Sequence, residues 1–181
     1  MSKELEYKFL ISETQKSKIL EFLKINAKYL GEFLQKDTYF VSKFRDYEID
    51  GETMECLRIR TTKTGSVLCY KKIHREANPI YCDEYETKIE DAENLAKILL
   101  ATEFIEQMVI EKTRQSFLFG DCEFDFDSVK NLGEFVEIEF KGKDESKFDE
   151  IFLTLSQFGI FKENANYDGI QKLMKQKLGL N

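Results

Sequence analysis

The sequence has few of the residues that build covalent or metal-linked scaffolds. Its 181 residues include one proline, one histidine, four cysteines and no tryptophan. The cysteines form no Cys-x-x-Cys pair and His74 has no thiol near it, which argues against a structural zinc site and favours reduced, buried thiols. With a single histidine, no Ser-His-Asp or Cys-His arrangement stands out, so covalent catalysis has no support in the sequence.

Long apolar runs and glycine-rich phosphate loops are also missing. No apolar run approaches the roughly 18 residues of a membrane span, and the first residues carry charges where a secretory signal would be apolar. We therefore expect a soluble, cytoplasmic protein with no membrane partner. A formal net charge of −7 argues against a nucleic-acid partner. Because neither phosphate-loop pattern occurs, any phosphate would be held by side chains.

The residues that are abundant are phenylalanine, tyrosine and charged residues. Hydrophobic residues make up 42% of the chain, with 16 Phe and 8 Tyr, which is enough for one core. The length fits one domain, so we expect residues 1–181 to form a single domain. Charged residues reach 34%, above the roughly 25% of an average globular protein, so the charges must crowd the surface or line an interior.

Alternating polar and apolar residues predict most of the secondary structure. From Glu4 to Ile11 every second residue is apolar, which is typical of a strand with one charged face. Ser12 opens a capping-box pattern before a helical apolar spacing. Consecutive strands favour an α+β fold with an antiparallel sheet. Strands are predicted at 4–11, 36–41, 56–62, 67–73, 81–89, 108–117, 118–126 and 135–141, and helices at 13–26, 95–99, 148–155 and 170–178.

The charges follow the strand period. The spacing Glu-x-Glu-x-Lys occurs three times, beginning at Glu4, Glu84 and Glu137. Because the amphipathic helices need the apolar strand faces, the charged faces point away from them, toward solvent in an open sheet or into a polar lumen in a closed one. Carboxylates two residues apart suit Mg²⁺ or Mn²⁺, and the forks of Arg58 and Arg60 suit phosphate oxygens. Such a face would accommodate a multivalent anion bridged by divalent cations.

With these residues laid out, the sequence resembles the CYTH superfamily, the triphosphate tunnel metalloenzymes that include class IV adenylate cyclases and thiamine triphosphatases. The resemblance covers nearly the whole chain and begins with the family's N-terminal signature, Glu4-Leu5-Glu6-Tyr7-Lys8. The later elements follow in the family's order, and the last of them is most similar to the cyclase-type branch. They are Lys36–Phe40, Leu57–Arg60, Tyr70-Lys71, Glu84–Glu86, Lys112–Arg114 and Asp127–Glu139.

The resemblance implies an eight-stranded antiparallel β-barrel, the triphosphate tunnel, with helices packed outside. It implies Mg²⁺ or Mn²⁺ as the cofactor, bound by the acidic residues Glu4, Glu6, Asp127, Glu137 and Glu139, with Asp127 as a ligand or an orienting group. It implies that six basic residues hold the triphosphate and act in catalysis: Lys8, Arg58, Arg60, Lys71, Lys112 and Arg114. It adds Glu84, Glu86 and Tyr167 as substrate-binding positions, Tyr167 at a tunnel mouth.

The implied activity is that of a divalent-metal-dependent adenylate cyclase, which converts ATP to cyclic AMP and pyrophosphate. The alternatives are a hydrolase acting on thiamine triphosphate or tripolyphosphate, and a non-catalytic module that binds polyphosphate or nucleotide. An apolar-ligand barrel is disfavoured by the charged strand faces. The relatives also make a homodimer an expectation.

Three single positions carry further expectations. Relatives carry Arg where this chain has Cys82, so one cationic contact is missing. The family's Tyr-Lys pairing selects Lys71 over Lys72, although strand parity alone leaves both open. His74 is expected in a surface loop.

Overall fold

The computed structural model describes residues 2–77, 81–142, 146–166 and 168–179, without the side chains of residues 2–4, 146 and 147. The chain divides into two compact units. The first consists of Met1–Glu4, Leu34–Lys112 and Asp168–Asn181, and the second of Leu5–Phe33 and Thr113–Tyr167. Strands β1 (Ser2–Ile11), β2 (Lys28–Ser42) and β8 (Phe104–Phe119) each contribute residues to both units. Whether the chain is one domain stays a prediction.

Eight long strands pair in one antiparallel order that closes on itself. The order is β1-β10-β9-β8-β2-β5-β6-β7, and β7 pairs back to the first residues of β1. This pairing confirms the predicted eight-stranded antiparallel sheet and the α+β class. The remaining long strands are β5 (Glu55–Thr62), β6 (Gly65–His74), β7 (Tyr81–Ile89), β9 (Cys122–Val129) and β10 (Gly133–Phe140).

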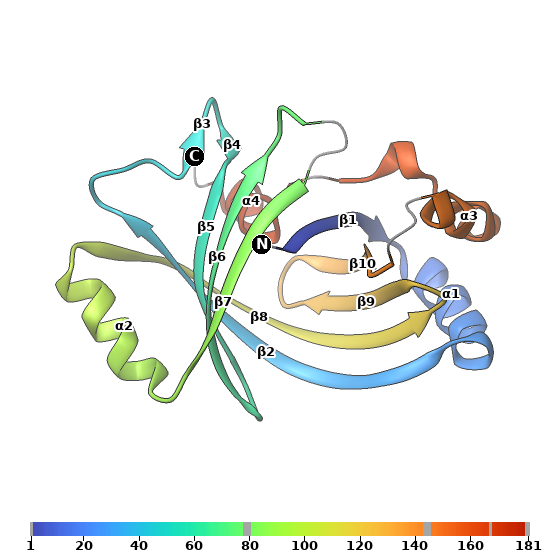
Figure 1. The fold of residues 1–181 in the computed structure, drawn as a ribbon, viewed down its shortest axis with the longest axis horizontal. Coiled ribbons are helices and arrows are strands. Elements are labelled where there is room, and N and C mark those ends of the chain that lie inside the picture. Colours follow the sequence, from blue (N-terminus) through green and yellow to red (C-terminus); the bar gives the residue numbers. More distant parts are fainter. Residues whose placement is uncertain (1, 78–80, 143–145, 167, 180–181) are drawn as a thin grey trace. The chain divides into compact units, whose positions relative to one another are not determined.

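The second unit packs two helices on the apolar faces of its strands (Figure 1). Helix α1 (Glu13–Asn26) begins at the predicted capping box, in which Gln15 N donates to Ser12 Oγ at 3.2 Å. Helix α3 (Ser146–Leu155) continues into a 3₁₀ turn at Ser156–Phe158 and stops at Gly159, whose φ of 74° is the left-handed conformation that glycine tolerates. The helix limits predicted from the sequence are confirmed within a few residues.

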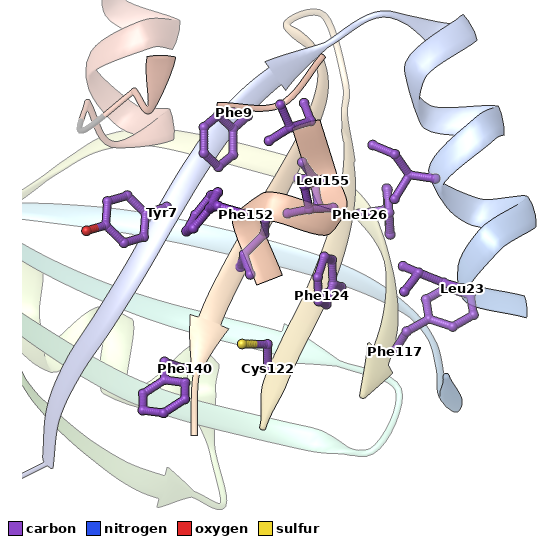
Figure 2. Close-up of a cluster of buried hydrophobic side chains, with 14 of the residues drawn as sticks. Tyr7, Phe9, Leu23, Phe117, Cys122, Phe124, Phe126, Phe140, Phe152 and Leu155 are labelled. Carbon is purple, nitrogen blue, oxygen red and sulfur yellow. The ribbon is translucent and has the colours of Figure 1, made fainter. Parts of the chain in front are cut away.

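The core of this unit is built largely from aromatic rings that the strands and α3 share. Figure 2 shows Tyr7 and Phe9 of β1 facing Phe152 of α3. The Tyr7 and Phe152 rings meet edge to face with centroids 5.3 Å apart. Phe124 is completely buried. Rings in this geometry add about 0.5–1.5 kcal/mol per pair beyond the burial of their area.

The first unit covers its strands with helix α2 (Ala92–Ala101). Leu95 and Leu99 of α2 pack on a buried cluster that contains Phe40, Leu57 and Ile59. A small hairpin, β3 (Glu48–Ile49) with β4 (Glu52–Thr53), was not predicted. Its glutamates form ion pairs with the C-terminal helix α4 (Ile170–Leu178), including Glu52 with Lys172 at 2.7 Å.

Strand alternation sorts the side chains as predicted. In β1, Leu5, Tyr7, Phe9 and Ile11 are buried in the apolar core, and Glu6 and Lys8 alternate with them. In β5, Leu57 and Ile59 join the core of the first unit, and Arg58 alternates with them. The apolar faces therefore meet the helices, and the charged faces point away from them.

Some element limits differ from the predictions. Strand β8 runs on to Phe119 and turns at Gly120, whose φ is 58°, rather than breaking after Phe117. Strand β2 begins eight residues earlier than predicted, at Lys28. His74 is the last residue of β6, not a loop residue: its Nε2 lies 2.9 Å from Asp83 Oδ2 and its ring stacks on Tyr81. Within the described residues, no helix combines the length and the apolar character needed to cross a membrane.

We predict that Leu155→Ala lowers the free energy of unfolding by about 2–5 kcal/mol, because the truncation leaves a cavity in a closely packed core. Leu155 is 2% exposed, whereas Leu153 on the same helix is 77% exposed, so Leu153→Ala is the matched control and should change stability by less than about 0.5 kcal/mol. Urea unfolding measures both. Equal losses in the two variants would contradict the packing described for α3.

Candidate functional site

The first group of charged side chains lies in the first unit and is called here the Asp37 cluster: Asp37, Arg58, Arg60 and Lys112. Asp37 is 1% exposed, and Arg60 grips it with two hydrogen bonds, Nε to Oδ1 at 2.7 Å and Nη2 to Oδ2 at 2.8 Å. Arg58 Nη1 approaches Oδ2 at 3.4 Å. The strand register explains the meeting, because Asp37 on β2 lies directly opposite Arg60 on β5.

Positive charge dominates the Asp37 cluster. Burial alone would raise the pKa of Asp37, but Arg58, Arg60 and Lys112 together hold it well below its usual range. Burial opposes the charge of Arg58 as well, yet Asp37 keeps its pKa well above the usual value. The charges of Arg58, Arg60 and Lys112 therefore all act on this one buried carboxylate.

One donor of this cluster has no acceptor among the described residues. Arg58 Nε is buried and makes no hydrogen bond there. A buried donor without a partner costs about 1–3 kcal/mol.

The neighbouring strands add a further cation, Lys71. Its Nζ lies 3.0 Å from Glu84 Oε2, and its backbone lies opposite that of Glu84 in the strand register. Lys72 is exposed, so the structure favours Lys71 as the lysine that shares this face.

The second group lies in the second unit and is called here the Arg114 cluster: Lys8, Arg114, Asp125, Asp127 and Glu137. Arg114 donates to both oxygens of Asp127, from Nε at 2.7 Å and Nη2 at 2.6 Å, and also to Asp125 and Glu137. Lys8 Nζ lies 2.9 Å from Glu137 Oε1. Ser116 Oγ donates to Asp125.

Negative charge dominates the Arg114 cluster. Burial raises the pKa of Asp125 to about 6, with Glu137 and Glu123 adding to the shift and Arg114 opposing it. Burial would lower the pKa of Lys8, but Glu137 and Glu6 raise it above its ordinary value. The cluster itself contains three carboxylates, Asp125, Asp127 and Glu137, and two cations, Lys8 and Arg114.

A row of glutamates crosses the strands next to this cluster. Glu6 on β1 lies directly opposite Glu139 on β10, and Glu139 lies opposite Glu123 on β9. Directly opposed residues have Cβ atoms about 4.5–5.5 Å apart, at which like charges repel. Lys141 offsets part of the charge, with Nζ 2.6 Å from Glu139 Oε2 and 3.9 Å from Glu123 Oε2. A divalent cation would relieve the rest of the repulsion.

The donor chemistry of this row fits Mg²⁺ or Mn²⁺. All its donors are carboxylate oxygens, the ligands that hard cations prefer. Glu6 and Glu139 of this row, together with Glu137 of the Arg114 cluster, would hold the ion. Asp127 is 0% exposed and both its oxygens accept from Arg114, so in this structure it orients the guanidinium.

The structure sorts the predicted site residues into two sets. Arg58, Arg60, Lys71, Lys112, Glu84 and Glu86 belong to the first unit, and Lys8, Arg114, Glu6, Asp127, Glu137 and Glu139 to the second. Tyr167 and the side chain of Glu4 lie outside the described residues; the backbone of Glu4 pairs with Cys82. The roles of all these residues stay predictions.

Three residues of these groups were not predicted from the sequence as site residues. Asp37 belongs to the motif Lys36–Phe40, but only the β2–β5 register reveals that it accepts hydrogen bonds from Arg60. Asp125 shares the alternation of Asp127, a signal that could have identified it. Glu123 is identified only from the pairing of β9 with β10, which places it opposite Glu139.

The strand order and the ionised strand faces define an α+β protein with a charge-lined antiparallel sheet. The CYTH domain model matches residues 2–166. The chain therefore belongs to the CYTH family. It is 32% identical over 166 residues to a protein of Methanocaldococcus jannaschii named as a candidate adenylate cyclase, and the match covers 89% of this chain and 92% of that protein.

Solved structures share the fold. A conserved hypothetical protein of Pyrococcus furiosus superposes with a TM-score of 0.76 at 24% identity, over 94% of this chain and 99% of that one. A protein of Hippeastrum, described as a candidate adenylyl cyclase with a dominant triphosphatase activity, gives a TM-score of 0.67 at 16% identity, over 99% and 96% of the two chains. At these identities the likeness establishes the fold alone.

We predict that Asp37→Asn destabilises the protein by about 3–5 kcal/mol, because removing one charge from a buried ion pair leaves its partners uncompensated. The exposed Asp46→Asn is the control and should have little effect. Denaturant unfolding of both variants measures the difference. A loss below about 1 kcal/mol for Asp37→Asn would mean that Arg58 and Arg60 do not depend on this carboxylate.

Proposed function

We propose that the protein is a divalent-metal-dependent enzyme that acts on a triphosphate, with ATP cyclisation to cyclic AMP and pyrophosphate as its reaction. The observation that carries the proposal is the Asp37 cluster, where Arg58, Arg60 and Lys112 act on one buried carboxylate and Arg58 Nε has no acceptor among the described residues. Membership of the CYTH family supports the same substrate class.

The Asp37 cluster suits phosphate oxygens. Arg58 is held by Asp37 through one terminal nitrogen at 3.4 Å, and its Nε is left with no acceptor in the described chain. A guanidinium in this state can donate to a phosphate oxygen without first losing a strong partner. Arg60 is fixed by two short bonds to Asp37, so its position is set before the ligand arrives.

Glutamates of the second unit, from the acidic row and the Arg114 cluster, suit the metal. Glu6, Glu137 and Glu139 supply oxygen ligands, and Arg114 holds Asp127 and Asp125 in place beside them. When bound, Mg²⁺ or Mn²⁺ supplies neutralisation of phosphate charge as a Lewis acid. Lys8, 2.9 Å from Glu137 Oε1, keeps that carboxylate oriented.

In the proposed reaction, the 3′-hydroxyl oxygen of ATP forms a bond to the α-phosphorus. The bond between that phosphorus and the pyrophosphate oxygen breaks, and the hydroxyl proton is released. The negative charge that develops on pyrophosphate is stabilised by Arg58, Arg60 and Lys112, whose charges stay fixed during the reaction. No residue is assigned as the base.

Hydrolysis of a triphosphate is the second candidate function. In it, water attacks the terminal phosphorus and orthophosphate leaves. Cys82 stands where the family resemblance leads us to expect Arg, and this missing cationic contact leaves the choice between the two reactions open. The dominant triphosphatase activity described for the Hippeastrum protein adds weight to hydrolysis.

One assay separates the candidates. The purified protein is incubated with ATP, tripolyphosphate or thiamine triphosphate, each with Mg²⁺ or Mn²⁺, and the products are resolved by chromatography. Equal amounts of cyclic AMP and pyrophosphate from ATP support the cyclase, with tripolyphosphate acting as an inhibitor. Orthophosphate from tripolyphosphate or thiamine triphosphate, without cyclic AMP from ATP, supports the hydrolase. No turnover of any substrate with either ion would overturn both and leave a binding module.

We predict that Glu6→Gln reduces turnover at least 100-fold while the melting temperature stays within a few degrees, because the change keeps the shape but removes a charge that a hard cation needs. Glu21→Gln on the exposed face of α1 is the matched control and should keep full activity. Steady-state rates at saturating Mn²⁺ measure the effect. Turnover equal to wild type would show that Glu6 is not a metal ligand.

A further inference from the structure

A buried thiol lies between two carboxylates on the polar side of strands β6 and β7. Cys69 is directly opposite Glu86 in the strand register and is 0% exposed. Its Sγ donates to Glu84 Oε1 at 2.9 Å. The sulfur and one oxygen of each glutamate all lie within 4.8 Å of one another. All three residues belong to the first unit.

Ordinary packing does not account for this thiol. A buried cysteine usually behaves as a small apolar side chain among other apolar ones. Here its cross-strand neighbours are Arg58 on one side and Glu86 on the other. A free thiol is only a weak donor to the carboxylate that it faces.

The two glutamates differ in what they already bind. Glu84 uses Oε2 for Lys71 Nζ at 3.0 Å, which leaves Oε1 for the thiol. Glu86 is exposed, and it forms no hydrogen bond or ion pair within the described part of the chain. A cation that replaced the thiol proton would gain three ligands without displacing Lys71.

We propose that Cys69, Glu84 and Glu86 form a site for a thiophilic divalent cation, with Zn²⁺ as the matching chemistry. Zn²⁺ accepts thiolate sulfur at about 2.3 Å and carboxylate oxygen at about 2.0–2.2 Å, and three protein ligands leave a fourth position for water. On binding, the S–H bond breaks, the proton leaves to solvent and the sulfur–metal bond forms, with no change of oxidation state. The three ligand atoms already lie within 4.8 Å of one another, and side-chain rotation on the strands can adjust their spacing.

This site is distinct in chemistry from the acidic row of the second unit. The row offers only oxygen, which suits Mg²⁺ or Mn²⁺, whereas the sulfur of Cys69 selects softer ions. The site also shares strand β6 with Lys71, two residues away. Its existence does not rest on the proposed enzymatic function.

Binding of Co²⁺ and Zn²⁺ to metal-free protein tests the proposal. Co²⁺ bound to a thiolate gives a ligand-to-metal charge-transfer absorption that carboxylate sites lack, so the wild type should show this band and Zn²⁺ should abolish it by competition. Cys69→Ser should lose the band, and Glu86→Gln should weaken Zn²⁺ binding at least tenfold by calorimetry. Cys122→Ala is the matched control, because Cys122 is equally buried but lies in the apolar core of the second unit.

Each outcome decides the question. Loss of the band in Cys69→Ser with an unchanged melting temperature, and its retention in Cys122→Ala and Glu6→Gln, supports the site. If Cys69→Ser fails to fold, Glu86→Gln and Glu84→Gln carry the test, and unchanged Zn²⁺ affinity in both overturns the proposal. Absence of the band in wild-type protein, or its persistence in folded Cys69→Ser, also overturns it.

Discussion

Buried charges of opposite sign must neutralise one another, and the interior of each unit is arranged around this constraint. Side chains alternate along each long strand, and the apolar face packs on the helices. Glu6 and Lys8 therefore lie on the opposite face, together with charged residues of neighbouring strands. In the first unit, Arg60 donates one hydrogen bond to each carboxylate oxygen of the buried Asp37. Replacing such pairs by apolar residues is often neutral or stabilising, so stability alone does not explain them.

The helices fix which face of each strand is buried in the apolar core, so the charged side chains take the opposite face. Phe152 and Leu155 of α3 and Leu23 of α1 bury the apolar face of the second unit. A one-residue slip in a strand would exchange its two faces, and every charged side chain on it would turn into the apolar core. The core therefore sets the register on which the Arg114 cluster depends.

Local sequence patterns could predict the strand faces and the helix limits, but not the contacts between side chains on different strands. The faces of β1, the capping box at Ser12 and the stop at Gly159 are local patterns, and all are found as expected. The contact of Asp37 with Arg60 joins residues 23 apart, and it follows from the β2–β5 register, which no local pattern specifies. His74 was misassigned for the same reason, because its partner Asp83 lies on the next strand. The small β3–β4 hairpin is too short for a two-residue period to be visible.

The pKa values of two buried aspartates, Asp37 and Asp125, reflect the charges around them. Burial by itself raises the pKa of both Asp37 and Asp125, because it disfavours the charged form. At Asp37 three cations reverse that effect and the carboxyl stays ionised, whereas at Asp125 the nearby carboxylates add to it and the pKa rises to about 6. The pKa of the same residue type, on the same kind of strand face, is thus shifted in opposite directions. Arg58, Arg60 and Lys112 thus stabilise negative charge at Asp37, whereas burial and the neighbouring carboxylates disfavour it at Asp125.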